Sequence, residues 1–223
     1  MVRGLFVTGT DTNVGKTVVS AALMHRYGRE VLLRYWKPIQ TGIEQDPGGN
    51  DTAEVARLGE CRRDQLIDAG VRLPRPLSPH LAARQSGITI ELQPLVDIAT
   101  QANQALLVEG AGGAMVPLND REFMTDLMSR LGLPVVIVSR STLGTINHTL
   151  LTIDALRRRS LTIAGVVMVG PPDADNREAI EQRGGVPVVG EMPLFQPLTP
   201  SRLCAWATVE LDRDGHLLEI LGR

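Results

Sequence analysis

The chain has 223 residues, a formal net charge of −2, 22% charged residues and 3% aromatic residues. This balance argues against a surface for nucleic acid or an anionic membrane, and aromatic residues are too few for a base-stacking platform. No apolar run approaches the ~20 residues of a membrane-spanning helix, and the N-terminus lacks a signal-peptide pattern. We therefore expect one cytoplasmic domain, residues 1–223, in which the distant Cys61 and Cys204 are idle thiols.

Short apolar runs alternate with helical patterns along the chain. The predicted strands are Gly4–Thr8, Val31–Trp36, Ala105–Glu109, Val135–Ser139, Ile163–Val169 and Val186–Val189. The predicted helices are Lys16–Tyr27, Thr52–Leu58, Pro79–Gln85, Pro94–Asn103, Phe123–Leu131, Thr145–Arg158 and Ala174–Gln182. Residues 212–223 fit either a hairpin or a terminal helix. Strands that are apolar on both faces are typical of a covered parallel sheet. We expect an α/β fold, a doubly wound, mostly parallel sheet with helices on both faces.

The first strand runs into the sequence GTDTNVGKT, residues Gly9–Thr17. The strict phosphate-loop pattern requires glycine at position 10, where this chain has Thr10. The Gly15-Lys16-Thr17 run nevertheless has the right register between a strand and a helix. Backbone N–H groups there suit phosphate oxygens, Lys16 can reach the β- and γ-phosphates, and the Thr17 hydroxyl can bind Mg²⁺. The pattern favours nucleotide binding over an ordinary strand–turn–helix.

Two other classes of phosphate-loop protein fit less well. Switch GTPases read guanine through an N-K-x-D sequence, which is absent from this chain. Partition-type ATPases carry a second lysine five places before the invariant one, and Asp11 occupies that place here. A partner-regulating ATPase switch of the partition type stays open as the alternative function.

Further motifs follow the loop in order. They are WKPIQTG (36–42), SPHLAA (78–83), VEGAGG (108–113), LGTINHTLLT (143–152) and VVGEMP (188–193). With these motifs the chain resembles the dethiobiotin synthetase family, whose loop reads GTxTxVGKT with the glycine displaced as it is here. Residues 60–75 and 199–223 match the family poorly. The resemblance implies a P-loop NTPase-like fold.

The resemblance also implies a reaction that depends on ATP and Mg²⁺. One amine of 7,8-diaminononanoate captures CO₂ as a carbamate, and ATP phosphorylates that carbamate. The second amine then attacks, expels phosphate and closes the cyclic urea of dethiobiotin, in biotin synthesis. The family further implies a homodimer with sites near the subunit interface. A third hypothesis is a cobyrinate-type amide-forming ligase of the same superfamily, but such ligases usually carry a long glutaminase domain, for which 223 residues leave no room.

The resemblance assigns site residues, and their chemistry suits the task. Lys37, Lys16 and Thr12 are expected to be catalytic, since carbamate and triphosphate are both anions. Thr41, Lys37 and Asn147 are expected to contact the substrate. Asn147, from the partner subunit, would meet the substrate carboxylate at a helix N-terminus, although it also fits an ordinary polar residue of a first helical turn. The residues expected at the nucleotide are Asn13, Val14, Gly15, Lys16, Thr17, Val18, Asp51, Glu109, Gly110, Ala111, Gly112, Val169, Gly170, Pro193, Leu194 and Phe195.

Thr17, Asp51 and Glu109 form the expected Mg²⁺ set, because Mg²⁺ prefers oxygen ligands. Glu109 follows an apolar strand run near the phosphate loop. Asp51 has a competing interpretation as the N-cap of the helix predicted to begin at Thr52.

One position departs from the family. Many members carry Asn-Asp after the strand that ends near residue 169, and the asparagine amide reads the adenine edge. Val169 and Gly170 stand in those places here. Valine has no side-chain donor or acceptor, so base preference stays open between ATP, another nucleoside triphosphate and weak selectivity.

Overall fold

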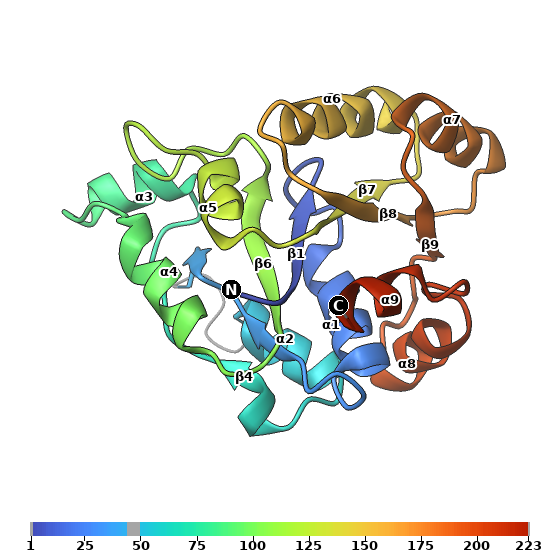
Figure 1. The fold of residues 1–223 in the computed structure, drawn as a ribbon, viewed down its shortest axis with the longest axis horizontal. Coiled ribbons are helices and arrows are strands. Elements are labelled where there is room, and N and C mark those ends of the chain that lie inside the picture. The colour runs from blue at the N-terminus through green and yellow to red at the C-terminus, as the bar shows by residue number, and fades with distance from the viewer. Residues whose placement is uncertain (1, 44–49, 223) are drawn as a thin grey trace.

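A computed structural model describes residues 2–43 and 50–222. Seven strands form one sheet in the order β4-β2-β6-β1-β7-β8-β9 (Figure 1). They are β1 (Gly4–Gly9), β2 (Arg34–Trp36), β4 (Leu66–Ile67), β6 (Leu106–Gly113), β7 (Val135–Arg140), β8 (Ile163–Val169) and β9 (Val188–Met192). Every pairing in this sheet is parallel. The predicted fold class is confirmed.

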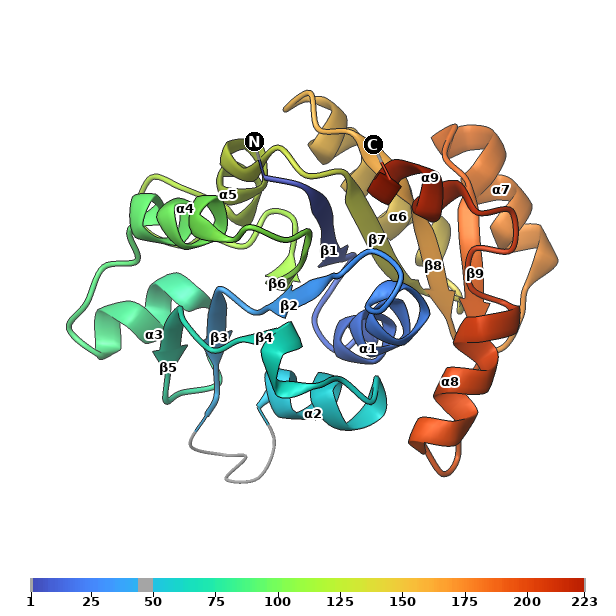
Figure 2. The ribbon, with the colours of Figure 1, turned by 60° about the horizontal axis from the view of Figure 1, so that its bottom comes forward.

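Helices cover both faces of the sheet (Figures 1 and 2). One layer holds α1 (Lys16–Tyr27), α2 (Asp51–Leu58), α8 (Pro200–Val209) and α9 (His216–Gly222). The opposite layer holds α3 (Pro79–Gln85), α4 (Leu92–Gln101), α5 (Met124–Leu131), α6 (Thr145–Arg157) and α7 (Ala174–Gly184). Strand β1 shows how the core divides, because Leu5 and Val7 pack into the first layer and Phe6 into the second. Within the described ranges, no helix has the length and apolar character needed to cross a membrane.

Three short strands and one helix were not predicted. Strands β3 (Ile39–Thr41) and β5 (Val71–Leu73) pair with each other in a separate parallel ribbon, and β4 is the seventh strand of the main sheet. Each of these strands is too short for its sequence to show the two-residue alternation that indicates a strand. Helix α8 has a recognisable start, with Thr199 capping the amide of Arg202 and proline in the first turn. The tail forms helix α9, so the hairpin alternative is wrong.

The position of β1 determines where ligands bind. The chain leaves β1 towards β2 on one side, returns through β6, and then crosses to β7 on the other side. Strand β1 therefore lies at the point where the winding reverses, and crevices in such sheets open at the carboxyl ends of the strands there. The loop between β1 and α1 enters the helix through Gly15, whose φ of 99° favours glycine.

Candidate active site

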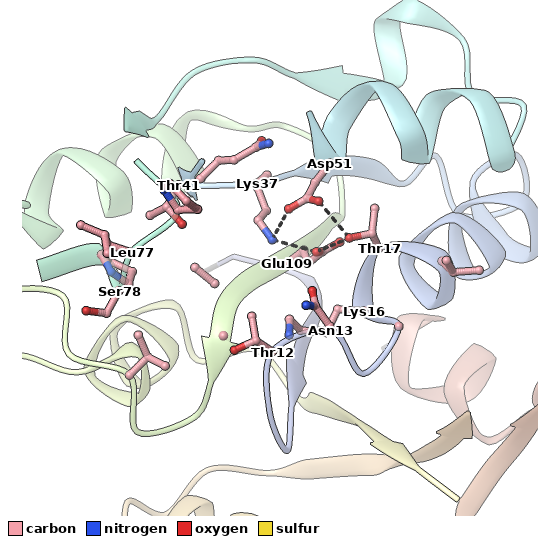
Figure 3. Close-up of a pocket in the computed structure, with 18 residues that line it drawn as sticks. Thr12, Asn13, Lys16, Thr17, Lys37, Thr41, Asp51, Leu77, Ser78 and Glu109 are labelled. Carbon is pink, nitrogen blue, oxygen red and sulfur yellow. Dashed lines mark hydrogen bonds and ion pairs between the residues drawn. The ribbon is translucent and has the colours of Figure 1, made fainter. Parts of the chain in front are cut away.

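A cavity of about 710 Å³ opens beside this loop, at the carboxyl ends of β1, β2 and β6 (Figure 3). Most of the residues predicted for catalysis, substrate and metal line it, together with five that were predicted only for the nucleotide. They are Thr12, Asn13, Gly15, Lys16, Thr17, Val18, Lys37, Thr41, Asp51, Glu109, Ala111 and Gly112. The fold thus brings together residues from five separate segments of the chain.

Lys37 is the centre of a buried charged network on one wall of the cavity (Figure 3). Its Nζ lies 2.7 Å from Oδ2 of Asp51 and 2.8 Å from Oε1 of Glu109. It also donates to the carbonyl of Gly110 at 3.2 Å. Burial alone lowers the pKa of Lys37, but the two carboxylates outweigh burial and raise that pKa above its ordinary value. Lys37 is therefore a fixed positive charge that faces the cavity.

Lys16 is held differently. Its Nζ donates to the backbone carbonyl of Asp11 at 2.9 Å, so the side chain folds back over the phosphate loop. Burial, with a further contribution from the charge of Lys37, lowers its pKa to about 8. Lys16 and Lys37 are the only two lysines in the sequence. Every lysine of the chain thus contributes to this one cavity.

Tyr35 is a site residue that sequence reasoning missed. It is fully buried in β2, and its hydroxyl donates to Oε2 of Glu109 at 3.0 Å. Burial first, and then the charge of Glu109, raise the pKa of Tyr35 well above its ordinary value. The signal was the strand period, because residues two apart share a face and Tyr35 precedes Lys37 by two. Tyr35 fixes one oxygen of Glu109 and leaves the other at the cavity.

Three oxygen-bearing side chains converge beside Lys37. The Thr17 Oγ1 lies 3.1 Å from Oδ1 of Asp51 and 3.1 Å from Oε1 of Glu109. Asn50, whose side chain accepts from the amide of Ala53, is the N-cap of α2. The N-cap interpretation of Asp51 is therefore wrong, and its carboxylate turns to the cavity. Burial raises the pKa of Asp51, but Lys37 outweighs it and the net shift is downward. One hydroxyl and two carboxylates suit a hard cation such as Mg²⁺.

A second cavity, of about 440 Å³, adjoins the first across Asn13, Gly15 and Val18. Its wall includes the remaining residues predicted for the nucleotide, Val14, Val169, Gly170, Pro193, Leu194 and Phe195. Arg140 and Thr142 also line it and were not predicted. Val169 is only 8% exposed, and a Cβ built on Gly15 would lie 3.3 Å from its methyl groups. The wall under the phosphate loop is thus hydrocarbon where an amide was expected.

Comparison with known proteins supports the motif pattern. A family model described as an AAA domain matches residues 3–202. The chain is 52% identical over 196 residues to the ATP-dependent dethiobiotin synthetase BioD of Paramagnetospirillum magneticum, covering 88% of this chain and 89% of that one. It is 41% identical to the BioD of Brucella ovis, covering 89% and 90% of the two chains. This chain belongs to the dethiobiotin synthetase family.

A solved structure shares the fold of this dethiobiotin synthetase family member without close sequence similarity. A ParA family ATPase from Chlorobium tepidum TLS superposes with a TM-score of 0.58, covering 99% of this chain and 98% of that one. The identity is 11%, so this likeness shows the fold alone. The doubly wound α/β architecture is thereby confirmed.

Two predicted residues lie outside both cavity walls. The carbonyl of Gly110 accepts a hydrogen bond from Lys37, although Gly110 itself does not line the cavity. Asn147 lies in the first turn of α6 on an exposed surface, between the exposed Leu143 and Leu151. The chain by itself does not bring Asn147 to the cavity.

Family motifs also supplied cavity residues that were not assigned a role. Gln40, next to Thr41, is buried with an Oε1 that has no hydrogen-bond partner among the described residues. Leu77 and Ser78, at the SPHLAA motif, form the wall across from Lys37 (Figure 3). Their place in the motif was the signal that sequence reasoning did not use.

Proposed function

We propose that the two adjoining cavities carry out the dethiobiotin synthetase reaction, the ATP-dependent closure of a cyclic urea from 7,8-diaminononanoate and CO₂. Membership of the dethiobiotin synthetase family supports the reaction itself. The observation that carries the site is Lys37, a buried ammonium that faces the cavity beside a phosphate loop. Phosphoryl transfer between two anions needs such a fixed charge, because both reactants otherwise repel each other.

The larger cavity suits the diamine and the triphosphate end of the nucleotide. An amine of the substrate attacks CO₂ and loses a proton to give a carbamate. The carbamate oxygen then attacks the γ-phosphorus, and ADP leaves. Lys16 and the backbone of residues 12–17 neutralise the phosphates, while Lys37 neutralises the carbamate and the transferred phosphoryl group. Thr12 and Thr41 offer hydroxyl groups from opposite walls. The second amine attacks the carbonyl carbon and loses a proton, the ring closes and phosphate leaves.

Mg²⁺ fits the oxygen set of Thr17, Asp51 and Glu109, and we propose that these residues hold it. When bound, the ion neutralises the charge of the triphosphate and orients it. Tyr35 orients the carboxylate of Glu109 through a hydrogen bond, and Lys37 holds both carboxylates in place through ion pairs.

We propose that the enzyme is a homodimer in which Asn147 completes the site of the partner subunit. Leu143 is fully exposed at 103%, and Leu151 is 61% exposed one turn beyond Asn147. Exposed large apolar side chains in the turn before α6 and within α6 suit a second protein surface. The free N–H groups at the start of α6 suit the substrate carboxylate.

The test is to incubate the purified chain with 7,8-diaminononanoate, bicarbonate, Mg²⁺ and ATP and to follow products by mass spectrometry. We expect dethiobiotin and phosphate in equal amounts, and neither when the diamine is omitted. The Lys37→Ala variant serves as the matched control. Slow phosphate release that the diamine does not stimulate, with no dethiobiotin formed, would instead support the partition-type ATPase switch.

A further inference from the structure

A cluster of three different metal-ligating side chains lies away from the active site, on the helical layer formed by α1, α2 and α8. A nitrogen of His25, a carboxylate oxygen of Glu60 and the Sγ of Cys204 all lie within 4.8 Å of one another. His25 belongs to α1, Glu60 follows the end of α2, and Cys204 belongs to α8. In the sequence these residues are far apart, so only the fold assembles them.

The three helices that carry or adjoin these residues are packed together. Figure 2 shows α1 lying between α2 and α8, and each pair of these helices is in contact. His25 and Cys204 are therefore anchored to two packed helices of one core layer, and Glu60 lies in the turn that follows the third helix, α2. A cation held by all three would join the helices to one another.

The donors are free to bind a cation. Within the described part of the chain, neither the His25 ring nor the Glu60 carboxylate makes a hydrogen bond or an ion pair. Among the described residues, the Cys204 thiol donates a hydrogen bond only to the carbonyl of Leu58, at 3.6 Å, in the last turn of α2. The C-terminal carbonyls of a helix carry partial negative charge, which favours a cation at this end.

A second thiol lies beside the cluster. Cys61 contacts the carbonyl of Val55 at 3.6 Å. Burial and the neighbouring Cys204 raise the pKa of the Cys61 thiol to about 11, and burial with Glu60 raises the pKa of Cys204. Thiols in this state are poor nucleophiles, because the reactive form is the thiolate. Cys61 and Cys204 are therefore not poised for thiol catalysis.

We propose that His25, Glu60 and Cys204 form a binding site for a borderline-soft divalent cation of the Zn²⁺ type. Imidazole, carboxylate and thiolate are all ordinary zinc ligands, whereas Mg²⁺ and Ca²⁺ avoid sulfur. Zinc–ligand bonds of about 2.0 to 2.3 Å place tetrahedral ligands roughly 3.5 Å apart, so side-chain rotation must draw the donors together by about 1 Å. Binding releases the thiol proton of Cys204 to solvent, and no electron is transferred.

The site has a definite relation to the active site. Helix α1 begins at Lys16 and Thr17 and reaches His25 near its other end, and α2 begins at Asp51 and ends just before Glu60. A cation at the cluster would fix the far ends of the two helices whose first residues face the nucleotide. Its expected role is therefore structural, and it stabilises the packing of α1, α2 and α8.

The experiment uses the full chain, kept reduced, stripped of metal with a chelator and titrated with Co²⁺ without nucleotide. We expect a thiolate-to-cobalt charge-transfer band that saturates at one equivalent. Co²⁺ at Thr17, Asp51 and Glu109 would give no such band, because that set holds only oxygen donors. Cys204→Ser and His25→Gln should remove the band, while Cys61→Ser should keep it. Absence of the band from the parent chain, or its survival in Cys204→Ser, overturns the proposal.

Thermal unfolding gives a second readout that does not depend on activity. Zn²⁺ at a hundredfold excess over its dissociation constant should raise Tm by about 5 to 10 °C in the parent chain. The rise should be absent from His25→Gln, a variant that circular dichroism must show to be folded. An equal rise in that variant would mean that zinc binds elsewhere, and the proposal would fail.

Discussion

The Nζ of Lys37 lies 2.8 Å from Oε1 of Glu109, and the two side chains are 5% and 0% exposed. A lysine this fully buried depends on its carboxylate partner for its charge, because burial alone lowers the pKa of Lys37 and the neighbouring carboxylates raise it. Asp51 and Tyr35 complete the arrangement from two other elements. The pair therefore links the stability of the fold to the chemistry of the cavity.

Lys37→Ala should abolish ring closure while the chain still folds and binds nucleotide. We expect turnover to fall well beyond tenfold, which corresponds to more than about 1.4 kcal/mol in the barrier. Removing one partner of a buried ion pair should also lower the free energy of unfolding by about 3 to 5 kcal/mol. Dethiobiotin formation and urea unfolding measure the two effects. Turnover within tenfold of the parent chain would show that Lys37 has another role.

Tyr35→Phe should weaken Mg²⁺ dependence without removing a group that touches the substrate. Loss of the hydroxyl leaves Oε2 of Glu109 without its donor, at a cost of about 1 to 3 kcal/mol in stability. The loosened carboxylate should raise the Mg²⁺ concentration needed for half-maximal activity by several fold. Turnover at saturating Mg²⁺ should change little. A fall in stability with an unchanged Mg²⁺ requirement would reduce Tyr35 to a purely structural residue.

Nucleotide affinity should depend on pH through Lys16, whose pKa is about 8 in the free site. Bound phosphate favours the ammonium and so raises that pKa in the complex. Below pH 8 both states are protonated and affinity is constant. Above pH 8 only the complex keeps the proton, so affinity should fall by about tenfold per pH unit until the pKa of the complex is reached.

Isothermal titration across pH 7 to 9.5 measures this dependence. Lys16→Arg is the control, because arginine keeps its charge and should give weaker but level binding. A level profile for the parent chain would contradict the lowered pKa.

Base selectivity should be weak, because hydrocarbon replaces the amide at Val169. We expect phosphate release with other nucleoside triphosphates to lie within about tenfold of that with ATP, whereas sites that hydrogen-bond a substrate group can reject analogues by 10⁴ or more. Val169→Asn should raise the preference for ATP, and Val169→Leu should leave it unchanged. A strong ATP preference in the parent chain would show that backbone groups alone read the base.

A shared site predicts complementation between two inactive variants. In a mixed dimer of Lys37→Ala and Asn147→Ala chains, one of the two sites has both residues intact. Activity should therefore recover to about a quarter of the parent level after random exchange, since half the dimers are mixed and each has one intact site of two. Leu143→Asp should prevent recovery by weakening the dimer. No recovery from folded, exchanging dimers would place Asn147 in its own subunit's site, or in none.

The long elements could be predicted because each carried its own periodic signal. Helix α1 begins and ends where the pattern placed it, and the buried strands β1, β7 and β8 were readable from their apolar runs. Strand β4 has two residues and strand β3 three, and such lengths hold no period. Their pairing depends on neighbours that only the folded chain supplies.

The candidate site divides in the same way. Lys16 and Thr17 lie in one contiguous motif, and the order and spacing of the motifs were enough to predict that Glu109 belongs to the same site. The contact between Tyr35 and Glu109 depends on strand register between β2 and β6, which one sequence does not state. The meeting of His25 with Cys204 depends on how α1 packs against α8. The prediction that Cys204 is a thiol without a function was based on its distance from Cys61 in the sequence, and such a distance says little about proximity in the folded chain.

The central place of β1 also has a consequence for how the protein is made. Strand β1 is synthesised before the strands with which it pairs in the described structure, β6 and β7, which begin at Leu106 and Val135. Pairing across such separations must overcome a large loop-closure entropy, and topologies of this kind fold slowly. The phosphate loop that follows β1 therefore lacks its neighbouring strands while about half of the chain is synthesised. During that interval the apolar face of β1 is open to chaperones and to misassembly.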